Sequence, residues 1–294
     1  MKNKAYIALF VSVISVSFAA IFIVSCNAPA LSIAFYRLLF TTLLIIPFVL
    51  FKKKIREELK NIPKKSYYIM ILIGIILATH FAFWIKSLEL TSVASSVILV
   101  TAHPLIVGPV SHFLLKERLS KINTTGIIIS VIGVVILVYG NYGFKANIDT
   151  IEGNILAILG GIAAGLYILG GRKLRKTISV GSYAFIVYLV ATIVLFFVCI
   201  LFSAPLIDIS FRDFGIIFLM AIVAGIFGHT LYNWSLGHIR ASIASVVLLI
   251  EPIGSSVLAL SLPWINQIPS NFTILGGAVI LLGVYMTARK ESKK

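Results

Sequence analysis

Five ionisable residues lie inside long apolar stretches of the sequence. They are Arg37, His80, His103, His229 and Glu251. A charged side chain at the centre of a membrane helix costs roughly 2.5–3.5 kcal/mol on insertion scales. Such a side chain therefore usually faces a cavity or a partner, and these five residues are the first candidates for solute binding or proton transfer.

Glu251 and His103 each stand directly before a proline, Pro252 and Pro104. Proline lacks a backbone N–H and frees a carbonyl one turn earlier, so polar groups tend to gather there. Glu251 could carry a proton or pair with a cationic solute, or it could form a structural ion pair with Arg37. His103 could line a cavity or be a hydrogen-bonded packing residue. Arg37 could attract an anionic group or extend its charged end to the membrane surface.

Two sets of aromatic and polar residues have helical spacing. His80 and Trp84 are separated by one helical turn, as are His229 and Asn233, and Trp234 is adjacent. Residues at this spacing meet on one helix face, where they could bind an amphipathic or cationic solute. Alternatively, the histidines and Asn233 join helices by hydrogen bonds, and the tryptophans anchor near the membrane surface.

The elements that position these residues are predicted to be membrane helices. Of the 294 residues, 60% are hydrophobic and 12% are charged, whereas soluble domains carry about 25% charged residues. The apolar stretches reach about 20 residues, enough for a helix to span a bilayer, and they lack the alternation of barrel strands. We expect an all-α membrane protein with ten transmembrane helices, at about 5–24, 31–51, 67–86, 91–115, 122–140, 153–171, 181–203, 213–236, 241–262 and 271–288.

The net charge of +15 does not indicate nucleic-acid binding, because the basic residues are collected in short loops. Of the 25 lysines and arginines, all but Lys86, Lys145, Arg212 and Arg37 fall at the two ends of the chain or in alternate loops. Such an excess marks the cytoplasmic side. The sequence therefore predicts a multi-pass protein of the cell membrane with both termini in the cytoplasm.

The two halves of the sequence repeat each other weakly but in order. The matching residues are Ser87-Leu88 and Pro104 against Ser235-Leu236 and Pro252, and Gly126 and Gly133-Val134 against Gly276 and Gly283-Val284. The glycines are expected to allow close helix packing. Because each copy would contain five spans, the second copy must be inverted in the membrane. Inverted repeats allow alternating access in many transporters.

The predicted organisation follows from this repeat. The first repeat occupies 1–140, an external connector 141–152, and the second repeat 153–294 with a short cytoplasmic tail. Segment 52–66 is the sizeable cytoplasmic loop and is expected to contain a short surface helix ending near Pro63. Neither a nucleotide loop nor a metal motif is recognisable, so no cofactor and no metal are expected, and gradients would drive any transport.

Two long stretches have a recognisable pattern. Residues 87–120 read SLELTSVASSVILVTAHPLIVGPVSHFLLKERLS, and residues 228–259 read GHTLYNWSLGHIRASIASVVLLIEPIGSSVLA. With the early FYRLL around Arg37 and the Gly-Asn pair at 153–154, they resemble the EamA family of the drug/metabolite transporter superfamily. The resemblance implies a ten-helix bundle, a central cavity lined by both repeats, and export of metabolites such as amino acids. The chain departs from the family pattern in the segment 263–266, where Pro-Trp-Ile-Asn replaces a common Gly-Glu pair.

The leading interpretation is a secondary transporter, most simply an exporter, that moves small metabolites by alternating access. Its partners would be a small-molecule substrate, the lipid bilayer and, in a proton-coupled version using Glu251 or a histidine, protons. An uncoupled uniporter, a membrane receptor or scaffold, and an intramembrane enzyme are the alternatives; an enzyme would need a denser cluster of acid, base or metal ligands. Candidates for the cavity wall are His80, Trp84, His103, His229, Asn233, Trp234 and Glu251, and candidates for ion pairing or coupling are Arg37 and Glu251.

Overall fold

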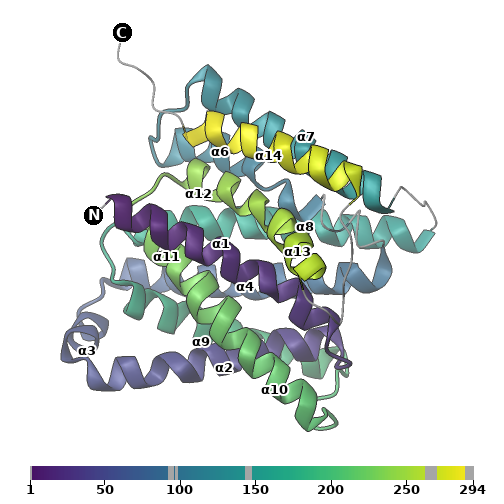
Figure 1. The fold of residues 1–294 in the computed structure, drawn as a ribbon. Coiled ribbons are helices and arrows are strands. Elements are labelled where there is room, and N and C mark those ends of the chain that lie inside the picture. Colours follow the sequence, from purple (N-terminus) through teal and green to yellow (C-terminus); the bar gives the residue numbers. More distant parts are fainter. Residues whose placement is uncertain (1, 92–95, 97–98, 143–147, 262–269, 289–294) are drawn as a thin grey trace.

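The computed structural model describes residues 2–91, 96, 99–142, 148–261 and 270–288. Within these ranges the chain forms a bundle of helices without a β-strand (Figure 1). The elements are α1 (Lys2–Val24), α2 (Ala30–Phe51), α3 (Lys53–Lys60), α4 (Lys64–Leu90), α6 (Pro104–Leu114), α7 (Lys121–Tyr142), α8 (Ile148–Leu174), α9 (Val180–Leu201), α10 (Phe211–Met220), the π-helix η1 (Ala221–Thr230), α11 (Leu231–Leu236), α12 (Ala241–Val247), the 3-10 helix η2 (Leu248–Ile250), α13 (Glu251–Ser261) and α14 (Asn271–Ala288).

The described ranges contain eight helices that are long and apolar enough to cross a membrane. They coincide with eight of the expected spans. The fourth and fifth expected spans correspond to shorter apolar helices at Leu99–Leu114 and Lys121–Leu137. Large apolar side chains such as Phe10 and Phe197 are more than half exposed on the outside of the bundle, as lipid solvation permits. The chain is therefore a multi-pass, all-helical membrane protein, and ten crossings stay a prediction.

The segments between the apolar helices differ from one another. The surface helix expected in segment 52–66 is confirmed as α3, which ends at Lys60, shortly before Pro63. By contrast, α7 continues to Tyr142 and α8 begins at Ile148, so helices extend into the expected connector from both sides. The departure from the family pattern at 263–266 lies outside the described residues.

Three of the expected spans are interrupted near the middle. In the fourth, the helix breaks at His103 and resumes at Pro104, with the N–H of Ile106 donating to the carbonyl of His103 at 3.0 Å. In the ninth, η2 stands directly before Glu251 and Pro252, and in the eighth the π-helix η1 follows α10. Proline removes a donor and clashes with the preceding turn. Both pre-proline positions therefore coincide with breaks, which membranes tolerate where the backbone is buried in protein or lines a water-filled space.

Helices α7 and α14 lie side by side at one edge of the bundle (Figure 1) and approach closely through glycines. A Cβ atom on Gly126 would lie 2.7 Å from the carbonyl oxygen of Gly283, and one on Gly283 would lie 2.5 Å from that of Gly126. Gly133 and Gly276 meet in the same reciprocal way, at 2.9 and 2.7 Å. The packing role expected for these glycines is confirmed.

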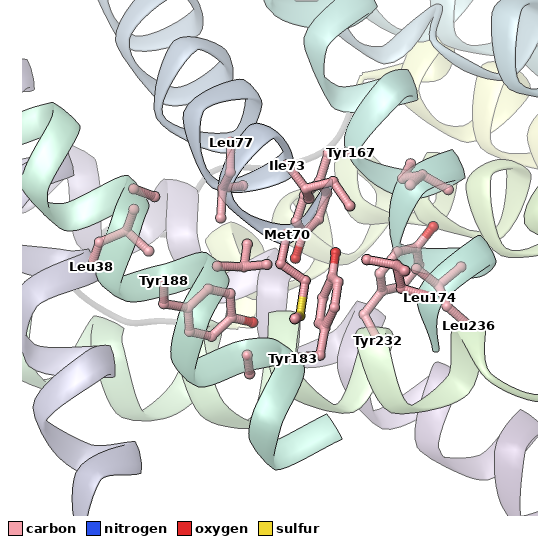
Figure 2. Close-up of a cluster of buried hydrophobic side chains, with 14 of the residues drawn as sticks. Leu38, Met70, Ile73, Leu77, Tyr167, Leu174, Tyr183, Tyr188, Tyr232 and Leu236 are labelled. Atoms are coloured by element: carbon pink, nitrogen blue, oxygen red, sulfur yellow. The ribbon is translucent and has the colours of Figure 1, made fainter. Parts of the chain in front are cut away.

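The largest buried cluster lies where α4 packs against α8 and α9. Figure 2 shows Met70 and Leu77 of α4 close to Tyr167 of α8 and to Tyr183 and Tyr188 of α9. The phenol rings supply apolar area, but each hydroxyl needs a hydrogen-bond partner when it is buried. This cluster therefore introduces polar groups into the core beside the interrupted helix that contains η1 and α11.

Candidate functional site

The ring of Phe81 on α4 lies between two of the predicted site residues. The guanidinium carbon of Arg37, on α2, is 4.9 Å from the centroid of the Phe81 ring. The ring of His229, in the π-helix η1, is 5.7 Å from the same ring in an edge-on arrangement. A cation over an aromatic face is attracted by the ring quadrupole, so Phe81 holds the buried Arg37 side chain in a fixed position among three helices.

His80 and Trp84 share one face of α4, as their spacing predicts. Their rings stack at 5.9 Å with an interplanar angle of 7°. The Nδ1 atom of His80 is 2.9 Å from the carbonyl oxygen of Gly160 on α8. Gly160 permits this contact, because a Cβ atom there would lie 3.2 Å from the backbone nitrogen of Trp84. His80 therefore joins α4 to α8. Its side chain is half-buried and its ring lies beside that of Phe81.

The two pre-proline residues approach the same region from two broken spans. His103 is buried, and its Nδ1 atom has no hydrogen-bond partner among the described residues. Glu251 is half-buried, and its backbone carbonyl accepts a hydrogen bond from the Ser17 hydroxyl of α1 at 3.3 Å. The breaks therefore place one imidazole and one carboxyl group where helices from different parts of the chain meet.

The five ionisable residues singled out from the sequence form one electrostatic group. Arg37 interacts through space with Glu251, His80 and His229. His103 interacts in turn with His80. Arg37 and Glu251 do not form a direct ion pair in the part of the chain that the structure describes. The guanidinium and the carboxyl group are therefore close enough for their charges to interact without direct contact.

Asn233 lies in a different environment, at the tyrosine cluster. Its Nδ2 atom donates to the hydroxyls of Tyr167 at 2.6 Å and Tyr188 at 3.0 Å. The Tyr188 hydroxyl is also 3.4 Å from the Oγ1 atom of Thr230, next to His229. Tyr183 and Asn233 are fully buried, and the Tyr183 hydroxyl and Asn233 Oδ1 have no partner among the described residues. This buried polar layer thus adjoins the group of ionisable residues through Thr230, which is next to His229.

The side chain of Trp234 points away from the group formed by Phe81, His80 and Trp84. Its ring contacts His238 at 4.7 Å, and the side chain packs at the margin of the core. Adjacent helix positions point about 100° apart, so Asn233 and Trp234 cannot share one face. The structure thus brings together Arg37, His80, Trp84, His103, His229 and Glu251, places Asn233 in the neighbouring polar layer, and leaves Trp234 outside.

A buried ion pair also joins helices of the bundle. Glu117, after α6, accepts from the Nε atom of Arg172 on α8 at 2.6 Å. Its other oxygen accepts from the backbone N–H of Ala241 at 2.8 Å, at the start of α12. A carboxylate at a helix N-terminus satisfies a free donor and complements the helix dipole. Glu117 therefore links three helices that are distant in sequence.

A second carboxylate outside the apolar helices caps α9. Glu58 of α3 accepts from the backbone N–H of Ser179 at 2.8 Å and from the hydroxyls of Ser179 and Ser182. Partial burial acts to raise the pKa of Glu58, but these hydrogen bonds and the charge of Arg175 outweigh it and lower that pKa below its ordinary value of 4.5. Glu58 is thus held ionised near neutral pH, where it fixes α3 against α9.

The arrangement is suited to binding and proton exchange. The described residues contain no group of three or more His, Cys, Asp and Glu side chains that could hold a metal ion. What they do contain is a guanidinium, a carboxyl group, imidazoles and aromatic faces within one region. A zwitterionic or amphipathic solute presents complementary groups to such a site.

Phe81, which contacts Arg37 and His229, and Tyr167 and Tyr188, which belong to the neighbouring polar layer, were not predicted from the sequence. Each lies in an apolar helix rich in other aromatic residues. Phe81 directly follows His80 in the sequence, but this adjacency does not show which way its ring points. The tyrosines have no local signal either, because their partner Asn233 is on another helix.

A multi-pass bundle with broken helices around charged, partly buried side chains has the architecture of a membrane transporter. The chain belongs to the EamA-like transporter family, whose family profile matches residues 3–139 and again residues 151–289. The resemblance noted in the sequence is therefore confirmed across nearly the whole chain.

Relatives of known sequence agree with this family. A protein of Archaeoglobus fulgidus described as an uncharacterized transporter is 27% identical over 302 residues, which cover 99% of this chain and 100% of the relative. The uncharacterized transporter YyaM of Bacillus subtilis is 24% identical over 230 residues, covering 74% of this chain and 71% of its own. A solved crystal structure with 20% identity matches 98% of this chain and 97% of its own with a TM-score of 0.80, which supports the fold.

Proposed function

We propose that the transporter consists of ten transmembrane helices in two inverted five-helix repeats, 1–140 and 153–294, in the cell membrane with both termini in the cytoplasm. The reciprocal glycine contacts between α7 and α14 support this arrangement. Two copies related by a two-fold axis make reciprocal contacts. If residue i of the first copy contacts residue j of the second, then residue j of the first copy contacts residue i of the second. Gly126 corresponds to Gly276 and Gly133 to Gly283, and the observed contacts join Gly126 to Gly283 and Gly133 to Gly276.

The packing of other helices supports the same two-fold relation. The expected first and third spans are α1 and α4, and their counterparts are α8 and the broken helix containing η1 and α11. Helix α4 packs against α8, and α1 packs against η1 and α11, so equivalent pairs are in contact. The positive charge concentrated at one end of the bundle supports the cytoplasmic position of both termini.

Within this frame, the proposed activity is secondary export of small metabolites, such as amino acids or related organic solutes, by alternating access. One observation carries the proposal: Arg37, His80 and His229 contact the ring of Phe81, and Glu251, at a break in the ninth expected span, is close enough to Arg37 for their charges to interact. An amino acid carries a carboxylate and an ammonium group, which Arg37 and Glu251 complement. Aromatic faces at Phe81 and Trp84 offer contact for an apolar side chain.

Alternating access would proceed by opening and closing the two ends of the bundle. At the end that carries the chain termini, the polar layer around Asn233 is fully buried, and Glu117 pairs with Arg172. His80, His229 and Glu251 are half-buried. We assign the described conformation to the state closed toward the cytoplasm, and opening would separate the three helices that Glu117 joins.

We further propose that Glu251 is the proton-binding residue. A carboxyl group near Arg37 can release its proton when a substrate cation arrives beside it and take up a proton again when that cation leaves. This exchange couples proton movement to substrate movement without a nucleotide. The histidines would orient the solute and the ring stack rather than carry the proton.

The test uses the full chain in proteoliposomes preloaded with a mixture of labelled amino acids. We expect saturable efflux that accelerates when a pH gradient is imposed. Glu251→Gln should retain the folded state and lose the response to the gradient, whereas Glu57→Gln, an exposed control, should respond normally. Gradient-dependent efflux in the Glu251→Gln protein would remove Glu251 from the coupling role, and efflux absent from wild type with every labelled solute tested would contradict the substrate class.

A further inference from the structure

Segment 52–65, which runs from the end of α2 into the first turn of α4, is strongly basic on its exposed surface. Within it, Glu57 is the exposed acidic residue and is 3.7 Å from Lys53, one turn away on α3. The second acidic residue, Glu58, is turned inward to Ser179 and Ser182. The exposed cations are Lys52, Lys53, Lys54, Arg56, Lys60, Lys64 and Lys65. One exposed carboxylate therefore opposes seven cations.

The helix α3, which carries four of these cations, is docked on the bundle. Ile55 and Leu59 pack against the main core, and a Cβ atom on Gly181 would lie 2.6 Å from Cδ1 of Ile55. The hydrogen bonds from Ser179 and Ser182 fix Glu58 on the same inward face. With one face of this short helix bound to protein, its lysines extend from the remaining, exposed surface.

Aromatic residues exposed on the outside of the bundle flank these cations on both sides. Phe48 and Phe51 end α2, with 56% and 84% of their surface exposed, and Tyr67 and Tyr68 begin α4, with 45% and 67% exposed. The Nζ atom of Lys52 lies 5.6 Å from the Phe48 ring centroid. Tyrosine rings exposed at helix ends, such as those of Tyr67 and Tyr68, are enriched at the level of the lipid headgroups. The cations of segment 52–65 are thus beside the bilayer surface.

We propose that segment 52–65 is a binding site for the phosphate groups of anionic phospholipids. Clustered lysines and arginines next to a membrane helix attract anionic headgroups, and each contributes at short range. The neighbouring aromatic rings favour a lipid over a soluble polyanion, because only a lipid supplies acyl chains beside Phe51 and Tyr68. A lipid bound there also stabilises the contact of α3 with the N-terminus of α9, since both surfaces of α3 are then occupied.

The test is the thermal unfolding of the full chain in a neutral detergent. We expect phosphatidylglycerol near 100 times its dissociation constant to raise the unfolding midpoint by about 5 °C or more. Phosphatidylcholine and inorganic phosphate at equal concentration should leave the midpoint unchanged. An equal shift with inorganic phosphate would overturn the lipid assignment, and so would a short RNA that shifts the midpoint when phosphatidylglycerol does not.

Matched variants locate the site. Lys54→Gln with Lys60→Gln and Lys64→Gln should bind phosphatidylglycerol at least about tenfold more weakly. The control removes three exposed cations elsewhere, by Lys121→Gln, Lys173→Gln and Lys176→Gln, and should retain wild-type binding. Equal losses in both triple variants would show that net charge alone attracts the lipid and would overturn the site. Lys60→Gln alone removes a single exposed charge and should give a smaller loss of phosphatidylglycerol binding. If the triple variant in segment 52–65 misfolds, this single variant is compared with the control instead.

Discussion

The Oγ1 atoms of Thr42 and Thr192 lie 3.2 Å apart, and these residues are separated by 150 positions in the chain. Gly126 and Gly276 have the same separation. A residue can contact its own equivalent only where a two-fold axis passes between the copies. The hydroxyl contact between α2 and α9 therefore marks where the proposed axis would cross the bundle, and α7 and α14 mark a second such point.

A cysteine pair tests the contact between these threonines. On a background of Cys26→Ser and Cys199→Ala, we expect Thr42→Cys combined with Thr192→Cys to form an intramolecular disulfide under mild oxidation, because the Oγ1 atoms are in contact. Thr41→Cys combined with Thr192→Cys is the matched control, since Thr41 faces Gly225 instead. Counting free thiols by mass spectrometry distinguishes the pairs, and equal oxidation of both would refute the packing.

The glycine contacts between α7 and α14 predict a stability change. A Cβ atom at Gly283 would lie 2.3 Å from Oγ of Ser130 and 2.5 Å from the carbonyl of Gly126, so Gly283→Ala should destabilise the protein by about 1–3 kcal/mol. Gly215 of α10 has nothing within 4 Å of such an atom, so Gly215→Ala should be neutral or stabilising by up to about 1 kcal/mol. The free energy of unfolding in detergent measures both effects. An unchanged free energy of unfolding for Gly283→Ala would show that α7 and α14 are not this close.

Phe81 predicts an effect on transport in addition to the modest loss of stability expected when a buried ring is replaced by a smaller side chain. Replacing its ring in Phe81→Leu removes the face on which Arg37 rests, so Arg37 should be less well placed for an anionic group. We expect KM for a transported solute to rise about threefold to tenfold, in line with a cation–π contribution of roughly 1 kcal/mol. Phe83→Leu, on the opposite side of α4, is the control. A lower kcat at constant KM would instead indicate a role in the conformational change.

Glu58 predicts a pH dependence of stability. Because its pKa is lowered in the folded protein, the stabilisation is fully present above the ordinary pKa of 4.5 and is lost as the pH falls through the lower, folded value. Between pH 6 and pH 3, wild type should therefore lose more thermal stability than Glu58→Gln. Glu57→Gln, which alters an exposed carboxylate on the same helix, should follow wild type. Parallel pH profiles for wild type and Glu58→Gln would contradict the capping of α9.

Most helix positions could be predicted from hydropathy, because each membrane helix is a long apolar stretch with charged ends. The breaks before Glu251 and at His103 could be anticipated from the following prolines, whereas the π-helix that carries His229 has no such marker. Proline acts on its own backbone, so its effect is local. A π-helix depends on how neighbouring helices pack, as at Gly225, where a Cβ atom would meet Thr41 at 2.3 Å.

The ionisable part of the site could be predicted because charge in an apolar helix is rare. Phe81 and the tyrosines could not be separated from lipid-facing aromatic residues, since the sequence does not specify how each helix is rotated. Trp234 illustrates the same limit, because its place next to Asn233 in the chain makes it a candidate for the cavity wall, yet its ring contacts His238. Side-chain direction thus decides membership of the site, and it is set by contacts between distant segments.

The inversion of the two halves can be measured directly by labelling equivalent loops from outside intact cells. Glu57 and Asp208 are exposed and lie in the corresponding loops of the two halves. On a background without Cys26 and Cys199, a membrane-impermeant maleimide should label Asp208→Cys readily and label Glu57→Cys only after the membrane is opened. Labelling of both positions from the same side would contradict the inverted arrangement and, with it, alternating access by exchange between the two halves.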